Sequence, residues 1–116
     1  MPTYRAGDIV RVPFPYTDRD VRQYRPALII SNGPLGDGDR FLWAPMITSA
    51  EHRRWPGDID MDGRHQDAGL PSPSLVRSAK IATVETNKVS PIGRLPDDLL
   101  VAVRTEMEKA LKAPAP

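Results

Sequence analysis

Proline is the residue that most constrains how this chain can fold. Thirteen of the 116 residues are proline, against an average usage of about 5%, and they are spread along the whole sequence. Because proline fixes φ and lacks a backbone N–H, it breaks helix interiors and is accepted in sheets mainly at edges and bulges. The spacing therefore predicts short strands joined by turns, and a helix only in the last part of the chain.

Several segments have the alternation or the short apolar run that is typical of strands. Residues 8–14 alternate polar and apolar side chains, whereas the segment 27–31 opens with a continuous apolar run over 27–30, as buried strands do. This run follows Pro26 and the polar, aperiodic residues 16–25, which predict a loop. The other strand segments are 40–48, 58–62, 75–77 and 80–85 (two strands, or one with a bulge) and 89–95, and irregular structure is predicted over 32–38, 49–57 and 63–73.

The only strong helical pattern lies over residues 96–112. Pro96 suits the first turn, and the two aspartates that follow it suit the positive end of the helix dipole. Leu99 and Val103 begin an apolar stripe at helical spacing. Five to seven short strands followed by one helix predict a mostly β fold, a small antiparallel barrel with the helix packed on it. The length suits a single domain over residues 1–116.

Cysteine and histidine usage limits the chemistry available to the chain. The absence of cysteine excludes disulfides, thiolate zinc sites and cysteine nucleophiles. The two histidines, His52 and His65, lie in predicted loops without ligand spacing, which argues against a histidine metal centre and predicts solvated side chains. No apolar run is long enough to span a membrane, and the N-terminus lacks a signal-peptide pattern. We therefore expect a cytoplasmic protein without a metal or other cofactor.

Two short motifs are similar to ligand-binding loops but lack parts that such loops need. Residues 58–63 match the first half of a calcium loop, yet the twelfth position, which requires a bidentate glutamate, is Gly69. We interpret this segment as an edge strand whose aspartates point outward and discourage edge pairing. The glycines of residues 33–38 have the spacing of a dinucleotide-binding loop, but a predicted strand follows them instead of a helix, so they predict a turn.

Arginine dominates the positive charge of the chain. Twelve of the sixteen basic residues are arginine, yet the formal net charge is only +1, which excludes a purely electrostatic nucleic-acid binder. Two arginines and several hydroxyls fall at predicted strand ends, where they could converge on one phosphate, because guanidinium groups match phosphate oxygens. These residues are Arg25, Thr48, Ser49, Ser74 and Arg77. Residue types alone favour the plainer alternative, in which the arginines pair with surface acids and the hydroxyls close turns.

Short motifs in a fixed order give the chain a family resemblance. They are GDIVRVPFPYTD (7–18), RPALIISN (25–32), APMITS (44–49), AGLPSPS (68–74) followed by VR (76–77), KIAT (80–83) and IGRL (92–95). Each motif is weak alone. Together they span nearly the whole chain, and their order resembles the PemK/MazF family of toxin–antitoxin ribonucleases.

The resemblance implies an SH3-like, CcdB/PemK-type barrel that forms a homodimer and cleaves single-stranded RNA at short sequences without a metal. Attack by the 2′-hydroxyl of the RNA would leave a 2′,3′-cyclic phosphate and a 5′-hydroxyl, and cutting mRNA would inhibit translation and growth. A cognate antitoxin protein would bind along the RNA groove. The implied catalytic residues are Arg25, Thr48 and Arg77. Around them we expect RNA-binding side chains from Tyr16, Asp18, Arg19, Tyr24, Ser49, Trp55 and Ser74.

The chain departs from the family pattern where proton transfer is concerned. Ala79 stands where some members have an acid beyond the fifth-strand arginine, and Arg19 stands where some have a histidine in the first loop. The general base is therefore not identified, and Asp18 and Asp20 are candidates on that loop. Trp43 lies within a predicted strand and is expected in the core or at a dimer contact.

Two other functions fit the same barrel. One is a non-enzymatic gyrase inhibitor of the CcdB type, which acts through its C-terminal helix and lacks the arginine–threonine pair, so that Arg25 and Thr48 argue against it. The other is a catalytically silent barrel that binds RNA or a protein partner, an alternative that Ala79 keeps open.

Overall fold

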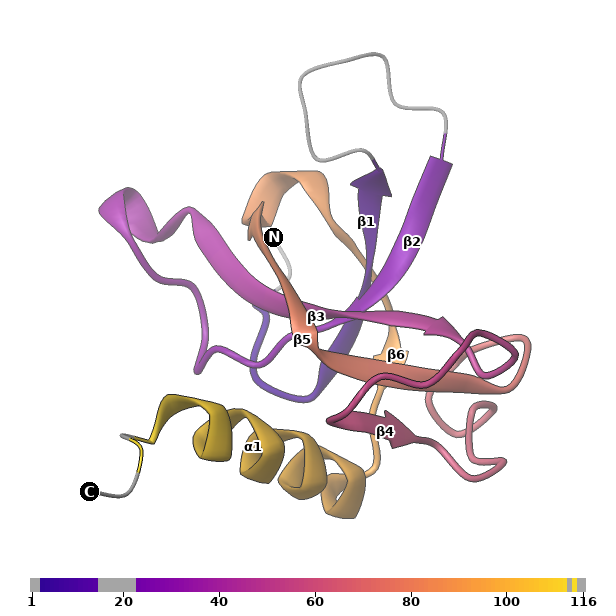
Figure 1. Cartoon of the computed structure of the whole chain (residues 1–116). Coiled ribbons are helices and arrows are strands. Elements are labelled where there is room, and N and C mark those ends of the chain that lie inside the picture. Colours follow the sequence, from indigo (N-terminus) through magenta and orange to yellow (C-terminus); the bar gives the residue numbers. More distant parts are fainter. Residues whose placement is uncertain (1–2, 15–22, 113, 115–116) are drawn as a thin grey trace.

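The computed structural model describes residues 3–14, 23–112 and 114, and this part of the chain contains six strands and a C-terminal helix (Figure 1). The strands are β1 (Asp8–Phe14), β2 (Gln23–Leu28), β3 (Phe41–Ser49), β4 (Asp58–Asp60), β5 (Ser74–Glu85) and β6 (Ser90–Arg94). The helix α1 is Asp97–Leu111, and two 3-10 turns, η1 (Asp37–Asp39) and η2 (Thr86–Lys88), precede β3 and β6.

All six strands belong to one antiparallel sheet with the order β4-β5-β3-β2-β1-β6. The sheet is strongly curled, and α1 packs below it next to β4 and β5 (Figure 1). Among the described strands, β4 and β6 form the two edges, so strand pairing does not close the sheet into a complete ring. The predicted class, a mostly β antiparallel fold with a C-terminal helix, is confirmed.

Strand β2 starts earlier than the sequence predicts. We expected a loop through residue 25, but Gln23, Tyr24 and Arg25 are already paired with β1, and the strand ends at Leu28. These three residues show no apolar alternation because their side chains are exposed. Their extended conformation comes from backbone pairing with β1, which composition does not reveal. The early start places Arg25 on a strand instead of a loop.

The two segments predicted around residues 75–85 form one strand, β5, with a bulge. Pro45 of β3 pairs with Ile81, whereas the next residue, Met46, pairs with Arg77, so the β5 residues between these partners leave the ladder. Because Pro45 has no N–H to donate, an irregularity at this point loses little hydrogen bonding. On both sides of the bulge β5 pairs with β3, so the two predicted segments form one continuous strand.

Both faces of the central strands are buried. Neighbouring residues of one strand belong to different hydrophobic clusters, as Ile9 and Val10 do in β1 and Met46 and Ile47 do in β3, because side chains alternate along a strand. This burial explains the uninterrupted apolar run that begins at residue 27. The cluster between the sheet and α1 contains Ile9, Leu28, Ile47, Met61, Ala68, Leu70, Val76, Leu95, Leu99, Leu100 and Val103, and the other contains Tyr4, Val10, Val12, Ala27, Ile29, Leu42, Ala44, Met46, Ala82 and Val84.

The helix packs through only part of its apolar stripe. Pro96 precedes the helix at the N-cap position, and Leu99 is buried in the first turn. At the other end Leu111 is 84% exposed, so the described chain leaves the last turn of the stripe uncovered. Asp98 accepts two hydrogen bonds from Arg64, at 2.9 and 2.7 Å, which tie the loop before β5 to the start of the helix. These bonds hold the pKa of the Asp98 carboxyl below its ordinary value.

Strand β6 approaches the segment before β5 so closely that Gly93 has no room for a side chain. A Cβ on Gly93 would lie 2.8 Å from the carbonyl carbon of Ala68 and 3.3 Å from the Cα of Gly69. Gly69 itself has φ +83°, and a Cβ there would lie 2.8 Å from the carbonyl oxygen of Ile92. The two glycines therefore bring this segment against β6, where Leu70 is buried in the cluster under the helix.

We expect Gly93→Ala to lower the free energy of unfolding by about 1–3 kcal/mol, the cost that is typical of overpacking. The added methyl meets backbone atoms, which move only if the whole segment moves. Urea unfolding followed by circular dichroism measures the change. Gly63→Asn is the control, because no atom lies within 4 Å of a Cβ at Gly63 and asparagine tolerates its φ of +80°. Equal stability of the Gly93→Ala variant and the unaltered protein would contradict this account.

Candidate active site

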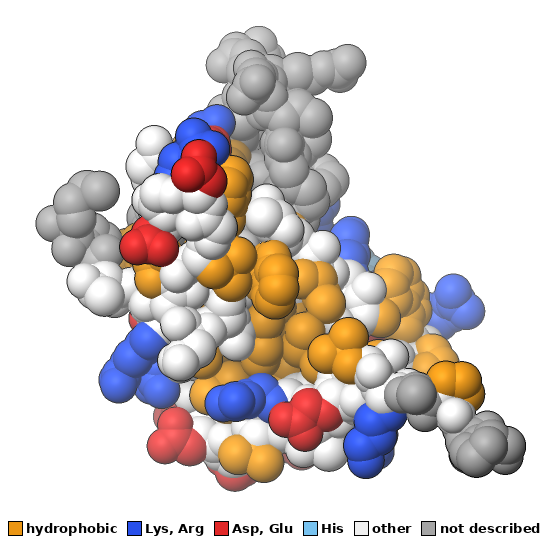
Figure 2. Space-filling model, turned by 90° about the vertical axis from the view of Figure 1, so that its left-hand side faces the viewer, with side chains coloured by type: hydrophobic (Ala, Val, Ile, Leu, Met, Phe, Trp, Pro, Cys, Tyr) orange, Lys and Arg blue, Asp and Glu red, His pale blue; other side chains and the backbone are white. Residues whose placement is uncertain are grey.

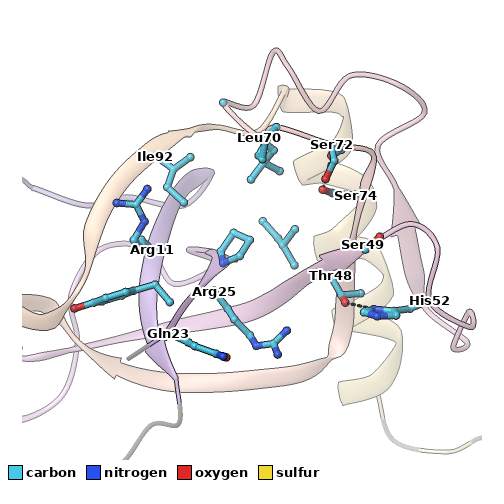
Figure 3. A pocket seen from close by; sticks show the side chains of 15 residues that line it. Arg11, Gln23, Arg25, Thr48, Ser49, His52, Leu70, Ser72, Ser74 and Ile92 are labelled. Carbon is cyan, nitrogen blue, oxygen red and sulfur yellow. Dashed lines mark hydrogen bonds between the residues drawn. The ribbon is translucent and has the colours of Figure 1, made fainter. Parts of the chain in front are cut away.

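A cavity of about 530 Å³ opens where β2 begins and β3 ends. Figure 3 shows polar side chains from β1, β2 and β3 and from the segment before β5 around this cavity, together with apolar side chains such as Leu70 and Ile92. The lining residues are Arg11, Gln23, Tyr24, Arg25, Pro26, Ile47, Thr48, Ser49, His52, Gly69, Leu70, Pro71, Ser72, Ser74 and Ile92.

The cavity brings together residues that lie far apart in the sequence. Arg25 reaches it from β2, and Thr48 reaches it from the end of β3. In Figure 3 the side chain of Arg25 extends toward the side of the cavity that Thr48 occupies. Ser49 and Ser74, which are cross-strand partners, line the same cavity, and so does the half-exposed Tyr24. Five of the residues predicted to act on RNA therefore share one cavity.

His52 belongs to this cavity, although the sequence predicts only a solvated loop residue. It is exposed, but its Nδ1 lies 2.6 Å from the Oγ1 of Thr48, a hydrogen bond drawn in Figure 3. A tight turn creates the contact, because the backbone N–H of His52 donates to the carbonyl of Ser49 at 3.1 Å. The signal available in the sequence was the four-residue spacing between a hydroxyl at a strand end and an imidazole.

Arg77 does not line the cavity, so the expected convergence of Arg25 and Arg77 on one phosphate is not seen. Alternation separates Arg77 from Ser74 but not from Thr48, because Thr48 pairs with Leu75, which lies on the same face of β5 as Arg77. The guanidinium of Arg77 is instead bound by groups of β4 and of the loop before it. Arg77 is only 8% exposed and is bound to other groups on its own face.

The guanidinium of Arg77 is neutralised by a buried carboxylate. Its Nε and Nη2 donate to Asp58 at 3.3 and 3.1 Å, and its Nη2 also donates to the backbone carbonyl of Arg53 at 2.8 Å. The ring of Trp55 covers it, with 4.0 Å between the guanidinium carbon and the ring centroid. Trp55 therefore packs on Arg77 and does not line the cavity where we expected it to bind RNA.

The outward orientation predicted for the aspartates of β4 is wrong for Asp58. Its side chain is only 2% exposed, because Asp58 is the cross-strand neighbour of Arg77 and pairs with it. The edge-strand prediction is confirmed, although β4 is shorter than the predicted 58–62, and Met61 just beyond it is buried in the core.

The same buried pair holds the loop that follows β3. Besides the bond from Arg77 to the Arg53 carbonyl, the N–H of Trp55 donates to Asp58 at 2.8 Å. Arg54 makes a further ion pair with Asp60. The pKa of the Asp60 carboxyl is lowered, mainly by the backbone N–H of Asp62 and then by Arg54. Loop 50–57 is thus fixed to β4 and β5 at several points, and it carries His52 to the cavity.

Several predicted residues cannot be placed at the cavity. Tyr16, Asp18, Arg19 and Asp20 lie outside the described residues. Ala79 is described, but it lies in the bulge of β5, on another surface.

That surface is an apolar groove, defined here by Trp43, Ser78, Ala79, Ile81, Thr83, Met107, Ala110 and Leu111. It lies between the sheet and the last turns of α1, and Figure 2, which faces this side, shows apolar side chains gathered across the middle of the face. Trp43 and Ile81 are each 50% exposed. The core position considered for Trp43 is therefore wrong, and the contact alternative is the one that fits its exposure.

Neither a metal cluster nor a membrane span is found in the part of the chain that the structure describes. No three histidine or acidic side chains there are grouped so that they could hold a metal ion. No described helix is both long enough and apolar enough to cross a membrane.

The protein family of this chain is identified by comparison with known families. The family described as PemK-like, MazF-like toxins of type II toxin–antitoxin systems matches residues 5–111. The chain belongs to this family. The match covers β1 to α1, so every element that forms the cavity lies within it.

Solved structures share the fold of this family member at low sequence identity. A crystal structure of MazE–MazF (Form-II) from Deinococcus radiodurans has a TM-score of 0.74 and 18% identity over 98% of this chain and 100% of that chain. An endoribonuclease from a mycobacterial species has a TM-score of 0.71 and 20% identity over 100% of this chain and 98% of that one. The endoribonuclease solved with its cognate antitoxin from a mycobacterial species has a TM-score of 0.66, with 20% identity over 97% and 99% of the two chains. Among curated protein sequences, no relative matches.

We expect Asp58→Ala to lower the free energy of unfolding by about 3–5 kcal/mol, because it leaves the Arg77 guanidinium buried without its carboxylate. Chemical unfolding measures the loss. The matched control is Arg54→Gln, which breaks an ion pair of the same loop whose arginine is 51% exposed and should cost less than about 1 kcal/mol. Similar losses in the two variants would mean that burial of the Asp58–Arg77 pair is not what stabilises this end of the sheet.

Proposed function

We propose that this family member is the toxin of a type II toxin–antitoxin pair and acts as a metal-independent, sequence-specific endoribonuclease on single-stranded mRNA, so that it inhibits translation and growth in the cytoplasm. The observation that supports this proposal most directly is that Arg25 and Thr48, from two different strands, line one open cavity. A cation and a hydroxyl on rigid strands are what a phosphodiester needs for orientation and charge stabilisation.

In the proposed reaction the RNA supplies its own nucleophile. The 2′-hydroxyl attacks the adjacent phosphorus, the bond to the 5′-oxygen breaks, and the products are a 2′,3′-cyclic phosphate and a 5′-hydroxyl. Arg25 stabilises the negative charge that develops on the phosphoryl oxygens, since a guanidinium stays protonated and matches those oxygens with paired N–H groups. Thr48 donates its hydroxyl hydrogen to one of the same oxygens. No metal is required for the charge balance of this scheme.

The remaining cavity residues suit the RNA on either side of the cut. Arg11, on β1 opposite the residue that follows Arg25, adds a second cation, while Ser49 and Ser74 offer hydroxyls. Tyr24 is 56% exposed at the rim and offers a face on which a base can stack. Arg77 is given a different role from the one the family resemblance implies, because its guanidinium is already bound to Asp58 and it holds loop 50–57 in place.

The proposed partners are an antitoxin and a second copy of the chain. Structures with a similar fold include MazE–MazF and an endoribonuclease with its cognate antitoxin, and by this likeness we expect an antitoxin to bind here. The apolar groove is the surface proposed for the homodimer. Its exposed Trp43, Ile81 and Leu111 form the kind of apolar patch that in monomeric proteins usually marks an interaction site.

We expect the purified protein to cleave single-stranded RNA in EDTA, and Arg25→Ala and Thr48→Ala each to reduce the cleavage rate by about 10²–10³-fold, as loss of one transition-state donor does. Mapping of the RNA ends should find cyclic phosphates. Arg104→Ala is the charge-matched control, because Arg104 is exposed on α1 outside the cavity. A requirement for added Mg²⁺, or full activity in both cavity variants, would contradict the proposal, and RNA binding without any cleavage would favour a silent barrel.

We expect light scattering to give a mass of twice 12.9 kDa for the unaltered protein and a monomer for Ile81→Lys, because the new charge would have to be buried at the contact. Val101→Lys is the control. Val101 is 62% exposed on α1 but does not line the apolar groove, so this variant should remain a dimer. Dissociation of both variants alike, or a monomeric unaltered protein, would exclude the groove as the dimer face.

A further inference from the structure

We propose that His52 is the general base of the reaction and takes the proton of the attacking 2′-hydroxyl on its Nε2. The inference rests on the proposed ribonuclease activity and assigns the proton acceptor that the sequence motifs leave unidentified.

The described residues that line the cavity include four titratable side chains, those of Arg11, Tyr24, Arg25 and His52. Guanidinium and phenol groups keep their protons at neutral pH, whereas an imidazole can exchange its proton there. No aspartate or glutamate is among these lining residues. Within the described lining, the imidazole is therefore the group that can accept a proton at neutral pH and release it again.

The hydrogen bond to Thr48 orients the ring for this role. With Nδ1 2.6 Å from the Oγ1 of Thr48, a neutral imidazole that donates its Nδ1–H to this oxygen has its lone pair on Nε2. Once Thr48 accepts that bond, its own hydroxyl hydrogen is available for a phosphoryl oxygen. One contact thus sets the tautomer of the base and the direction of the donor.

Hydrogen bonds fix the backbone at His52 and at the residue that follows it. On one side its backbone N–H closes the turn onto Ser49 at 3.1 Å. On the other, the carbonyl of the next residue, Arg53, accepts the 2.8 Å bond from buried Arg77. Arg77 is therefore a positioning residue for His52, acting through the loop and not through a phosphate.

The proton balance of the step closes without a further reactant. The O2′–P bond forms as Nε2 of His52 removes the 2′-hydroxyl proton, and the P–O5′ bond breaks with Arg25 beside the departing charge. The 5′-oxygen takes a proton from water, and the hydroxide that remains removes the proton from the imidazolium. The base requires neutral imidazole, so the cleavage rate rises with pH through the imidazole range and then levels off.

Other charged and titratable groups line the same cavity or flank His52 in the sequence, and they need controls. They are Tyr24 and Arg25 from β2, Arg11 from β1, and Glu51 and Arg53 on its own loop. Asp18 and Asp20 are outside the described residues and are tested directly by substitution.

The experiment measures single-turnover cleavage in EDTA across about pH 5 to 8. The substrate is a DNA oligonucleotide with one ribonucleotide at a cut site mapped beforehand on a long mixed-sequence transcript. For His52→Gln we expect kcat/KM to fall by about 10²–10⁴-fold and the rising limb to disappear. Affinity for the all-deoxy oligonucleotide should be unchanged, because the base acts only in the reaction. Added imidazole should restore part of the rate of His52→Ala.

Two control variants keep the imidazole at the cavity. Glu51→Gln removes the adjacent exposed charge, and His65→Gln removes the other histidine, which does not line the cavity. Both should retain the rate and the rising limb of the pH profile. Asp18→Asn and Asp20→Asn should retain the limb as well.

Each other outcome overturns a defined claim. If the unaltered protein cleaves but His52→Gln keeps its rate or its rising limb, the role of His52 is overturned and the ribonuclease proposal stands. The same holds if Asp18→Asn or Asp20→Asn removes the limb while His52→Gln retains it, or if His52→Gln loses rate equally at every pH. If the unaltered protein leaves all RNA intact, the proposed function is overturned and the role of His52 with it.

Discussion

A buried cation that needs neutralising organises the functional end of this fold. Taking Arg77 out of water costs several kcal/mol unless its donors are satisfied, and the satisfying groups are the Asp58 carboxylate, the Arg53 carbonyl and the Trp55 ring. These groups belong to β4 and to the loop before it. Neutralising one strand residue therefore fixes the course of the whole loop, including the turn that brings His52 to Thr48.

The strands and the helix could be predicted from local patterns, because alternation and proline spacing are direct consequences of burial and backbone chemistry. Two local errors have a common cause. Gln23 to Arg25 extend β2, and Asp58 is buried, only because of what lies opposite them on neighbouring strands. The type of a residue does not identify its cross-strand partner. A polar strand end is therefore predicted as a loop, and a buried acidic residue is predicted to be exposed.

The candidate site could be predicted in part for similar reasons. Arg25 and Thr48 meet because strand ends at one edge of a sheet converge, which the order of the motifs already implied. Asp58 and the Arg53 carbonyl hold Arg77 away from the cavity, and the residue type of Arg77 does not reveal these partners. His52 was missed because its four-residue spacing from Thr48 gains meaning only through a tight turn and through a loop that distant groups hold in place.

The bulge between β3 and β5 lies between two surfaces of different chemical character. On one side of it the two strands end at the cavity with Thr48 and Ser74, and on the other they carry Trp43 and Ile81 into the apolar groove. A change in sheet twist at Pro45 would rotate both pairs at once. The geometry of the cavity and the geometry of the apolar groove are therefore coupled through one strand pair, and a substitution that adjusts one surface is constrained by its effect on the other.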